Sequence, residues 1–533
     1  MAEMKAPRSG VRVRMYNPGF GDCFLLAFRG KDGKPVYVLI DCGVHGQYKG
    51  GSDRIRAVLR DVRAATGGHI HLAVVTHEHA DHVSGFYLGR GIFSGDGDPL
   101  GGIEVDEVWF AWTEDPRSAK ARRLDRVKKL LLQGLLGAPR SLNADEEGSM
   151  LGFYAMEGEG ASQGGANLPL GGSALGVSTR EAREALRRHA GKSTYLKPKQ
   201  PPLAIPGVDQ VRVFVLGPPE DEAALLSADP TGEEGEVYEG EGEDEDGHAF
   251  RFGAEEALVA ALGASGRVPG GAGDPPPDER YQPFGADHRL HRDKVRARPD
   301  LFCFDFFHRH YGFEPAASTG STEPGSAAAG ENAVDWRRID DEWLNGAESL
   351  ALKLDSATNN TSLVLAFELE GSRRVLLFPG DAQVGNWKSW HDGGWTHANG
   401  LAQGEEVTAA DLLERTVLYK VGHHGSHNAT LRRQGLELMT SDELIALIPV
   451  DEVWAHARKP HAWKMPFVPI YEDLKVRTKG RLVRTDQGVY RPQGGTKKER
   501  DRAIAEIDAA WKQFPGRKPK ENELYVELEI PDR

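Results

Sequence analysis

Apolar residues alternate with polar ones, or form short runs, near both ends of the chain, and these patterns predict strands. In the first half the predicted strands are 11–16, 23–28, 36–40, 72–75 and 105–112. Further predicted strands are 211–216, 362–369, 374–378, 416–421, 453–456, 481–484 and 524–530. Helical spacing of apolar residues predicts helices at 52–66, 117–136, 179–189, 409–415 and 498–514. Strands interleaved with helices indicate an α/β fold.

The pattern weakens between residues 138 and 356. Segments rich in Gly, Ala, Ser, Pro or acidic residues predict flexible linkers at 149–177, 233–246, 269–277 and 315–330. The aromatic stretch 301–311 predicts that part of this region packs. We therefore expect residues 1–136 and 357–533 to be the two halves of one domain. Residues 137–356 would be an insertion that serves as a lid or a surface for a protein partner, although the strand within 208–219 should belong to the core.

A group of metal-binding residue types follows the strand at 72–75. His77, His79, Asp81 and His82 lie within six positions of one another. If the chain stays extended as far as Asp81, alternation directs the first three side chains to one face, and a helix can begin after His82. Nitrogen and oxygen ligands without cysteine favour zinc, with manganese or iron as alternatives. The spacing predicts a site for two adjacent metal ions.

Other candidate groups also stand at the ends of predicted strands. Asp41 ends the strand 36–40, and we expect it either to orient a ligand or a water molecule or simply to form a turn. Asp381 follows the strand 374–378, and His423 and His424 follow the strand 416–421. Neighbours in a strand point in opposite directions, so only one of the two histidines can bind a given ion. We favour His424 as the ligand and His423 as the residue that faces the substrate.

These motifs resemble those of a known family. The string THEHADH at 76–82 resembles the H-x-H-x-D-H signature of the metallo-β-lactamase superfamily. GFGDCFLL, VLIDCG and KVGHHGS are similar to strings in the metallo-β-lactamase domain of ComEC-type DNA-uptake proteins and their soluble relatives. The resemblance covers about residues 11–112 and 359–490, without the membrane channel or oligonucleotide-binding fold of the uptake proteins. It implies a four-layer αββα sandwich with a long, partly flexible insertion.

The resemblance also implies a ligand set for two divalent ions, zinc being favoured and manganese an alternative. The expected metal ligands are His77, His79, Asp81, His82, Asp381 and His424, with Asp381 bridging the ions. Many members have a further histidine for the first ion, and here 359–362 stands in its place. That ion would then be held by His77, His79, Asp381 and water. We expect His423, Ser426 and Asn359 to contact the substrate.

Such a site would hydrolyse its substrate with a hydroxide between the ions. Asp41 or Asp81 could orient the water or accept its proton, and His423 could donate to the leaving oxygen or hold a phosphate. The family resemblance favours a phosphodiesterase or nuclease acting on nucleic acid or nucleotides. The alternatives are a hydrolase of a small ester, lactone or phosphorylcholine-type substrate, and a partner-binding subunit of a multi-protein system.

Composition narrows the cellular setting. The chain has 533 residues and a net charge of −14, which argues against non-specific duplex binding by the whole surface. The basic helix 117–136 is either a solvated face or a phosphate-facing rim. Three cysteines make no disulfide framework, and neither a signal peptide nor an apolar membrane span is evident. We therefore expect a cytoplasmic protein without membrane contact, in which Cys23 and Cys42 are core residues.

Overall fold

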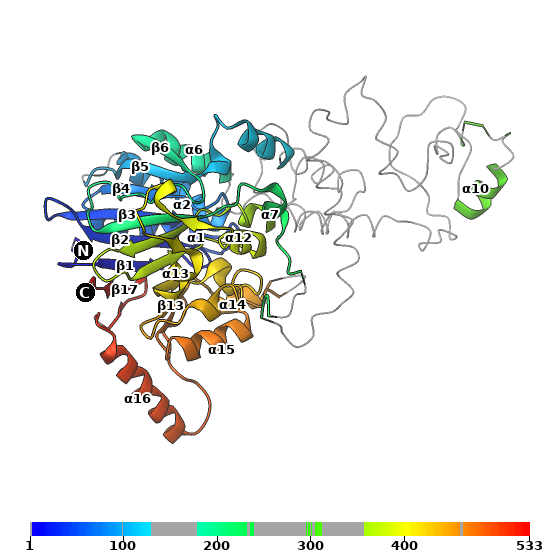
Figure 1. Cartoon of the computed structure of the whole chain (residues 1–533). Helices are drawn as coiled ribbons and strands as arrows, with labels where there is room; N and C mark the ends of the chain where they lie inside the picture. The colour runs from blue at the N-terminus through cyan, green and yellow to red at the C-terminus, as the bar shows by residue number, and fades with distance from the viewer. Residues whose placement is uncertain are drawn as a thin grey trace.

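Figure 1 shows the chain as a computed structural model, in which two large mixed sheets form the body of the molecule. The structure describes residues 3–128, 179–231, 235–238, 304–311, 356–458 and 462–533, apart from 97, 99 and 517, together with 295, 297, 298 and 300. Among these residues no helix is both long enough and apolar enough to cross a bilayer.

The first sheet has the order β16-β17-β1-β2-β3-β4-β5-β6. Its strands are β1 (Val11–Tyr16), β2 (Cys23–Arg29), β3 (Pro35–Cys42), β4 (His69–Val74), β5 (Glu104–Ala111), β6 (Lys192–Leu196), β16 (Lys520–Glu521) and β17 (Tyr525–Ile530). Strands β3 to β6 run parallel, and the others pair antiparallel. Val11 lies opposite Ile530, so the two ends of the described chain meet in one sheet.

The second sheet has the order β15-β14-β13-β12-β9-β8-β7. Its strands are β7 (Val211–Gly217), β8 (Val364–Leu369), β9 (Val375–Phe378), β12 (Thr416–Lys420), β13 (Ile445–Ile448), β14 (Leu482–Arg484) and β15 (Gly488–Val489). Strands β9, β12, β13 and β14 run parallel. Parallel strands carry their carboxyl ends to a common edge, and the candidate residues follow such ends in both sheets.

The two sheets pack face to face because their strands alternate between two apolar environments. In β2, Phe24 and Phe28 point into the core between the sheets, where their rings meet Phe378 and Phe367 of the other sheet at centroid distances of 5.4 and 6.3 Å. Leu25, between them, points to the outer face and joins the core under the helices. Helices cover both outer faces, so the layers run helix, sheet, sheet, helix.

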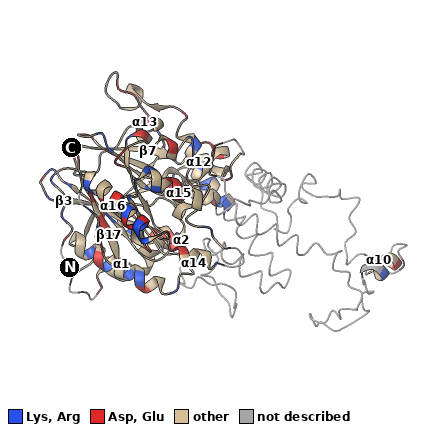
Figure 2. Ribbon diagram, turned by 90° about the horizontal axis from the view of Figure 1, so that it is seen from below, with Lys and Arg blue, Asp and Glu red and all other residues tan. Residues whose placement is uncertain are grey.

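The helices that pack on the first sheet are α1 (Gly51–Thr66), α2 (Ala80–Leu88), α3 (Arg90–Ser94) and α6 (Thr179–His189). The helices on the second sheet are α12 (Val384–Ser389), α13 (Ala409–Glu414), α14 (Glu452–His456) and α15 (Val468–Arg477). The remaining helices include α7 (Glu222–Leu226), α10 (Phe304–Tyr311) and α16 (Lys497–Gln513). Figure 2 shows acidic and basic residues side by side along α16, which begins with a capping box between Thr496 and Glu499.

Most predicted elements agree with the observed ones to within three residues. The prediction of a strand at 453–456 is wrong, because these residues belong to α14, whose first turn is capped by Asp451 through the Trp454 N–H. Of the predicted helix 117–136, residues 119–128 are helical and 129–136 lie outside the described residues. β6 and β7 fall within the range 137–356, and they pair with β5 and β8.

The predicted linkers at 149–177, 269–277 and 315–330 lie outside the described residues, as does the acidic run 233–246 apart from 235–238. Of the aromatic stretch 301–311, only α10 is described, with Phe304 buried and Phe306 exposed. Cys23 and Cys42 are buried free cysteines, as predicted.

Candidate metal centre

The histidine motif lies in the connection between β4 and α2. His77 and His79 follow the strand in extended chain, and His77 Nε2 lies 3.1 Å from His79 Nδ1. The condition of an extended chain as far as Asp81 is not met, because α2 begins at Ala80. The carbonyl of His79 already accepts hydrogen bonds from the N–H groups of His82 and Val83. Asp81 and His82 are therefore presented by the first turn of a helix.

Four buried side chains from both halves of the chain meet beside this motif. Asp81, His82, Asp381 and His424 each place one potential ligand atom within 4.8 Å of the others. His82 Nε2 lies 3.1 Å from Asp381 Oδ2, and His424 Nε2 lies 2.8 Å from Asp81 Oδ2. His77 and His79 are outside this group of four, although the ring centroid of His77 is 4.2 Å from that of His82. These buried His and Asp groups could hold metal ions.

Asp41 at the end of β3 positions the His82 ring. Asp41 Oδ2 accepts a hydrogen bond from His82 Nδ1 at 2.8 Å, which turns Nε2 of the same ring toward Asp381. Both Asp41 oxygens also accept hydrogen bonds from Thr76, from its N–H at 2.8 Å and its hydroxyl at 2.7 Å. Two residues after Asp41 the chain requires glycine, since a Cβ at Gly43 would lie 2.3 Å from the backbone nitrogen of His82. Asp41 therefore orients the His82 ring, and together with Asp22 and His82 it forms a second buried group that could hold a metal ion.

A buried lysine holds the other side of Asp381. Lys420, the last residue of β12, places its ammonium 2.9 Å from Asp381 Oδ1, 2.7 Å from Asp22 Oδ2 and 2.8 Å from the Gly380 carbonyl. The N–H of His423 donates to the same Asp381 oxygen at 3.1 Å. Asp381 Oδ1 is thus fully engaged, and Oδ2 alone turns toward His82.

The two adjacent histidines form a tight turn and not a strand. His423 and His424 have φ values of 45° and 53°, so the alternation on which their assignment was predicted does not apply. His424 Nδ1 is held by the Pro449 carbonyl at 2.6 Å, and its Nε2 faces Asp81. His423 lies outside the group of four, and its buried Nδ1 has no hydrogen-bond partner among the described residues. The structure therefore brings His424 into the cluster and leaves His423 beside it.

The cluster carries more buried negative charge than its lysine can balance. Asp22, Asp41, Asp81 and Asp381 are buried around a single buried ammonium, that of Lys420. Lys420 contacts Asp22 and Asp381, and no lysine or arginine contact is found for Asp41 or Asp81 among the described residues. Burial raises the pKa of Asp22, whereas His82 and other nearby cations outweigh burial and keep the pKa of Asp81 and Asp381 low. Buried anions need cations, and divalent ions would supply them.

The imidazoles respond to this negative field. Burial alone would lower the pKa of His82, but Asp381, Asp22 and Asp41 outweigh it and raise that pKa. The pKa of His424 is also raised, because its hydrogen bond with Asp81 and the nearby carboxylates outweigh its burial. Burial and the neighbouring histidines lower the pKa of His77. Without metal, the carboxylates therefore favour the protonated forms of His82 and His424.

The remaining predicted contact residues differ in their surroundings. Asn359 is fully buried, and neither side-chain atom has a hydrogen-bond partner among the described residues. Ser426 is buried, and its hydroxyl donates to Asn428 Oδ1 at 3.1 Å.

Sequence reasoning missed Asp22 and Lys420. Asp22 has the same signal as Asp381, a Gly-Asp pair beside a strand, although it precedes β2 instead of following a strand. Lys420 is a charged residue at the end of the otherwise apolar run TVLYK, a position where a lysine needs a buried partner. A scan against protein-family models and a search of curated proteins found no significant match to this chain.

Proposed function

We propose that the protein is a metal-dependent hydrolase of the metallo-β-lactamase fold, similar to the ComEC-type group, and that it cleaves phosphodiesters. One observation carries the proposal: His82 from the first half of the chain and Asp381 from the second lie 3.1 Å apart in a buried cluster of excess negative charge. The helix, sheet, sheet, helix layering is the arrangement that this fold requires. The cluster also stands where the carboxyl ends of parallel strands meet, the usual place for an α/β site.

The donor set fits two divalent cations. His77 and His79 would hold one ion, Asp81, His82 and His424 would hold the other, and Asp381 would serve both, on the nitrogen and oxygen donors that zinc accepts. Manganese is the alternative. Bound ions of this kind lower the pKa of a water molecule and offset charge that develops on a phosphoryl oxygen.

The surrounding residues would prepare the site for that chemistry. Asp41 fixes the ring of His82, and Lys420 holds Asp381 so that one carboxylate oxygen faces the cluster. Asp81 is the carboxylate left to orient the attacking water or accept its proton, because both oxygens of Asp41 are engaged. His423 and Asn359 have buried polar atoms without partners among the described residues, and in this proposal they hold a phosphate oxygen or donate to the leaving oxygen.

A turnover screen with loaded metal tests the proposal. Metal-free protein is supplied with zinc or manganese and assayed on single- and double-stranded DNA, RNA, bis(p-nitrophenyl) phosphate, a lactone and a thioester. We expect turnover of a phosphodiester, and we expect Asp381→Ala to abolish it and to lower the metal content measured by mass spectrometry.

Asp61→Asn is the matched control, because Asp61 is a buried carboxylate paired with Arg14 at 2.6 Å, outside the cluster. It should retain both metal and turnover. Equal turnover by wild type and Asp381→Ala would refute the proposal. Turnover of the lactone or thioester without any phosphodiester would favour the small-ester alternative.

A further inference from the structure

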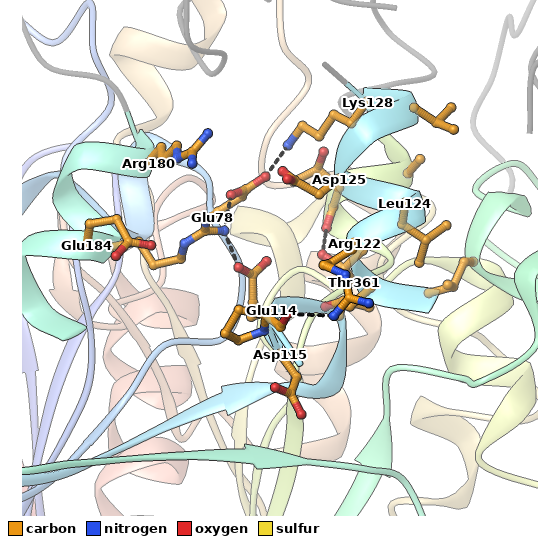
Figure 3. A pocket seen from close by; sticks show the side chains of 18 of the residues that line it. Glu78, Glu114, Asp115, Arg122, Leu124, Asp125, Lys128, Arg180, Glu184 and Thr361 are labelled. Atoms are coloured by element: carbon orange, nitrogen blue, oxygen red, sulfur yellow. Dashed lines mark hydrogen bonds and ion pairs between the residues drawn. The ribbon is translucent and has the colours of Figure 1, made fainter. Parts of the chain in front are cut away.

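A cavity of about 330 Å³ adjoins the connection between β4 and α2 that carries the histidine motif (Figure 3). Glu78, which stands between His77 and His79, lines this cavity, and so do Thr358 and Thr361 on either side of the buried Asn359. Its other walls are the helical residues 119–128 with the turn before them, α6 and α7. The cavity therefore shares one wall with the candidate metal centre, and its volume lies within the ordinary range for small-molecule sites.

A half-buried ionic network forms one side of the cavity. Glu78 pairs with Lys128 at 2.6 Å and with Arg183 at 2.5 Å, and Arg183 also pairs with Glu114. Glu78 is therefore paired with two cations. These ion pairs connect the β4–α2 connection to α6 and to the helical residues 119–128.

The lining holds buried polar atoms that have no partner in the described part of the chain. These atoms are Arg183 Nε, Arg187 Nε and Thr113 Oγ1, and each can donate a hydrogen bond. Unsatisfied buried donors are rare in native proteins and call for an acceptor. Apolar side chains from two helices, among them Leu124, Val127 and Leu226, form the rest of the wall. The complementary ligand has an apolar, planar body and several oxygen or nitrogen acceptors.

We propose that this cavity binds one nucleoside unit of the substrate, next to the scissile phosphate at the metal centre. The inference rests on the proposed phosphodiesterase function and narrows its substrate class to nucleotides and single-stranded nucleic acid. Guanidinium planes and leucine side chains can pack on the faces of a base, and the unpartnered donors can bind its acceptors or a flanking phosphate. A base in a duplex would first have to leave its stack, at a cost of a few kcal/mol, so duplexes are the poorer substrates.

Binding of nucleoside monophosphates by the metal-free protein tests this site without reference to turnover. AMP is titrated into chelator-treated wild type by calorimetry, with inorganic phosphate, ribose 5-phosphate and phosphorylcholine as comparison ligands. Leu226→Trp fills the cavity from α7, and we expect it to weaken AMP binding at least tenfold. Leu100→Trp is the matched control, since Leu100 is 74% exposed and outside the lining, and it should bind AMP as wild type does.

A second measurement avoids the risk that Leu226→Trp misfolds. Photolabelling of wild type with 8-azido-AMP should modify peptides from 113–128, 179–189 or 222–226, and unmodified AMP should compete. Labelling elsewhere, or AMP binding no tighter than that of phosphate or phosphorylcholine, would overturn the inference.

The two proposals fail separately. If the loaded enzyme cleaves no phosphodiester but AMP binds in this cavity, the proposed reaction is wrong and the nucleotide site stands. If thymidine 5′-(p-nitrophenyl phosphate) and methyl p-nitrophenyl phosphate are both cleaved, Leu226→Trp should lower kcat/KM at least tenfold for the first substrate only. Equal effects on both substrates would contradict the nucleoside site and would leave the proposed reaction unaffected.

Discussion

The ammonium of Lys420 lies 2.9 Å from Asp381 Oδ1, while Asp381 Oδ2 lies 3.1 Å from His82 Nε2. One oxygen of the Asp381 carboxylate thus pairs with a lysine, and the other oxygen faces a candidate metal ligand. Because Asp22 shares the same lysine at 2.7 Å, a single buried cation serves two buried anions. If the cluster holds a metal ion as proposed, binding of that ion should stabilise the folded protein at this point.

Replacement of Lys420 by methionine should destabilise the metal-free protein strongly. Removal of one partner from a buried ion pair typically costs about 3–5 kcal/mol, because the remaining charges lose their counter-ion. Divalent zinc would restore part of the missing positive charge, so the loss should be smaller in its presence. Urea unfolding with chelator and with zinc measures the difference.

The control is Lys518→Met, since Lys518 pairs with Asp508 at the surface. It should change the free energy of unfolding by less than about 1 kcal/mol under both conditions. A Lys420→Met loss that is identical with and without zinc would disprove the coupling.

Substitution of Asp41 by asparagine should weaken metal binding without removing a ligand. Asparagine tolerates the φ of 52° at this position, so the backbone need not change. The hydrogen bond to His82 would lose its charged acceptor, and loss of such a partner typically lowers metal affinity about 10–100-fold. Competition with a chromogenic chelator measures the affinity. The control is Asp106→Asn, at an exposed carboxylate beside His69, and it should leave the metal affinity unchanged. An unchanged metal affinity in Asp41→Asn would refute the orienting role of Asp41.

The adjacent histidines provide a matched pair of variants. Both have positive φ, so asparagine is tolerated equally well at either position. His424→Asn should abolish much of the stabilisation by zinc, which for wild type amounts to about 2.7 kcal/mol when zinc is at 100 times its Kd. His423→Asn should keep that stabilisation and lower kcat. Thermal unfolding with and without zinc distinguishes the two variants. Loss of the zinc stabilisation in His423→Asn and its retention in His424→Asn would make His423 the ligand.

The stability of the protein should depend on pH through Glu114. Burial raises the pKa of this carboxyl from 4.5 to about 7, Glu78 adds to the rise, and Arg183, Lys128 and Arg187 oppose it. The folded state thus holds a proton that the unfolded chain releases between about pH 4.5 and 7. The stabilisation is complete below pH 4.5 and is lost as the pH rises through 7.

Glu114→Gln removes this dependence. From pH 5 to 8, wild type should lose about 2.5 kcal/mol more stability than the variant, because the carboxyl pKa is about 7 in the folded state and 4.5 in the unfolded chain. Urea unfolding at both pH values measures the loss. Parallel pH profiles for wild type and Glu114→Gln would show that Glu114 does not titrate in this range.

Much of the candidate site could be predicted because its signals are local. A short apolar run indicates a strand from the residues within it, and His82, Asp381 and His424 stand just beyond such runs. The first turn of α2 was harder to locate, because the same residues suit an extended chain or a helix start. Capping by His79, whose conformation depends on its packing, decides between the two.

Most strands, and the strand ends that carry metal-binding residue types, follow from the sequence alone, since side-chain periodicity and turn chemistry act over a few neighbouring residues. The packing of distant segments places Lys420 between Asp22 and Asp381, turns Asp41 toward His82, and lines a cavity with Glu78. The physical reason is that a buried charge is stabilised by whichever opposite charge the packing of distant segments brings to it. His82 and Asp381 are 299 residues apart, and no local pattern records that they meet.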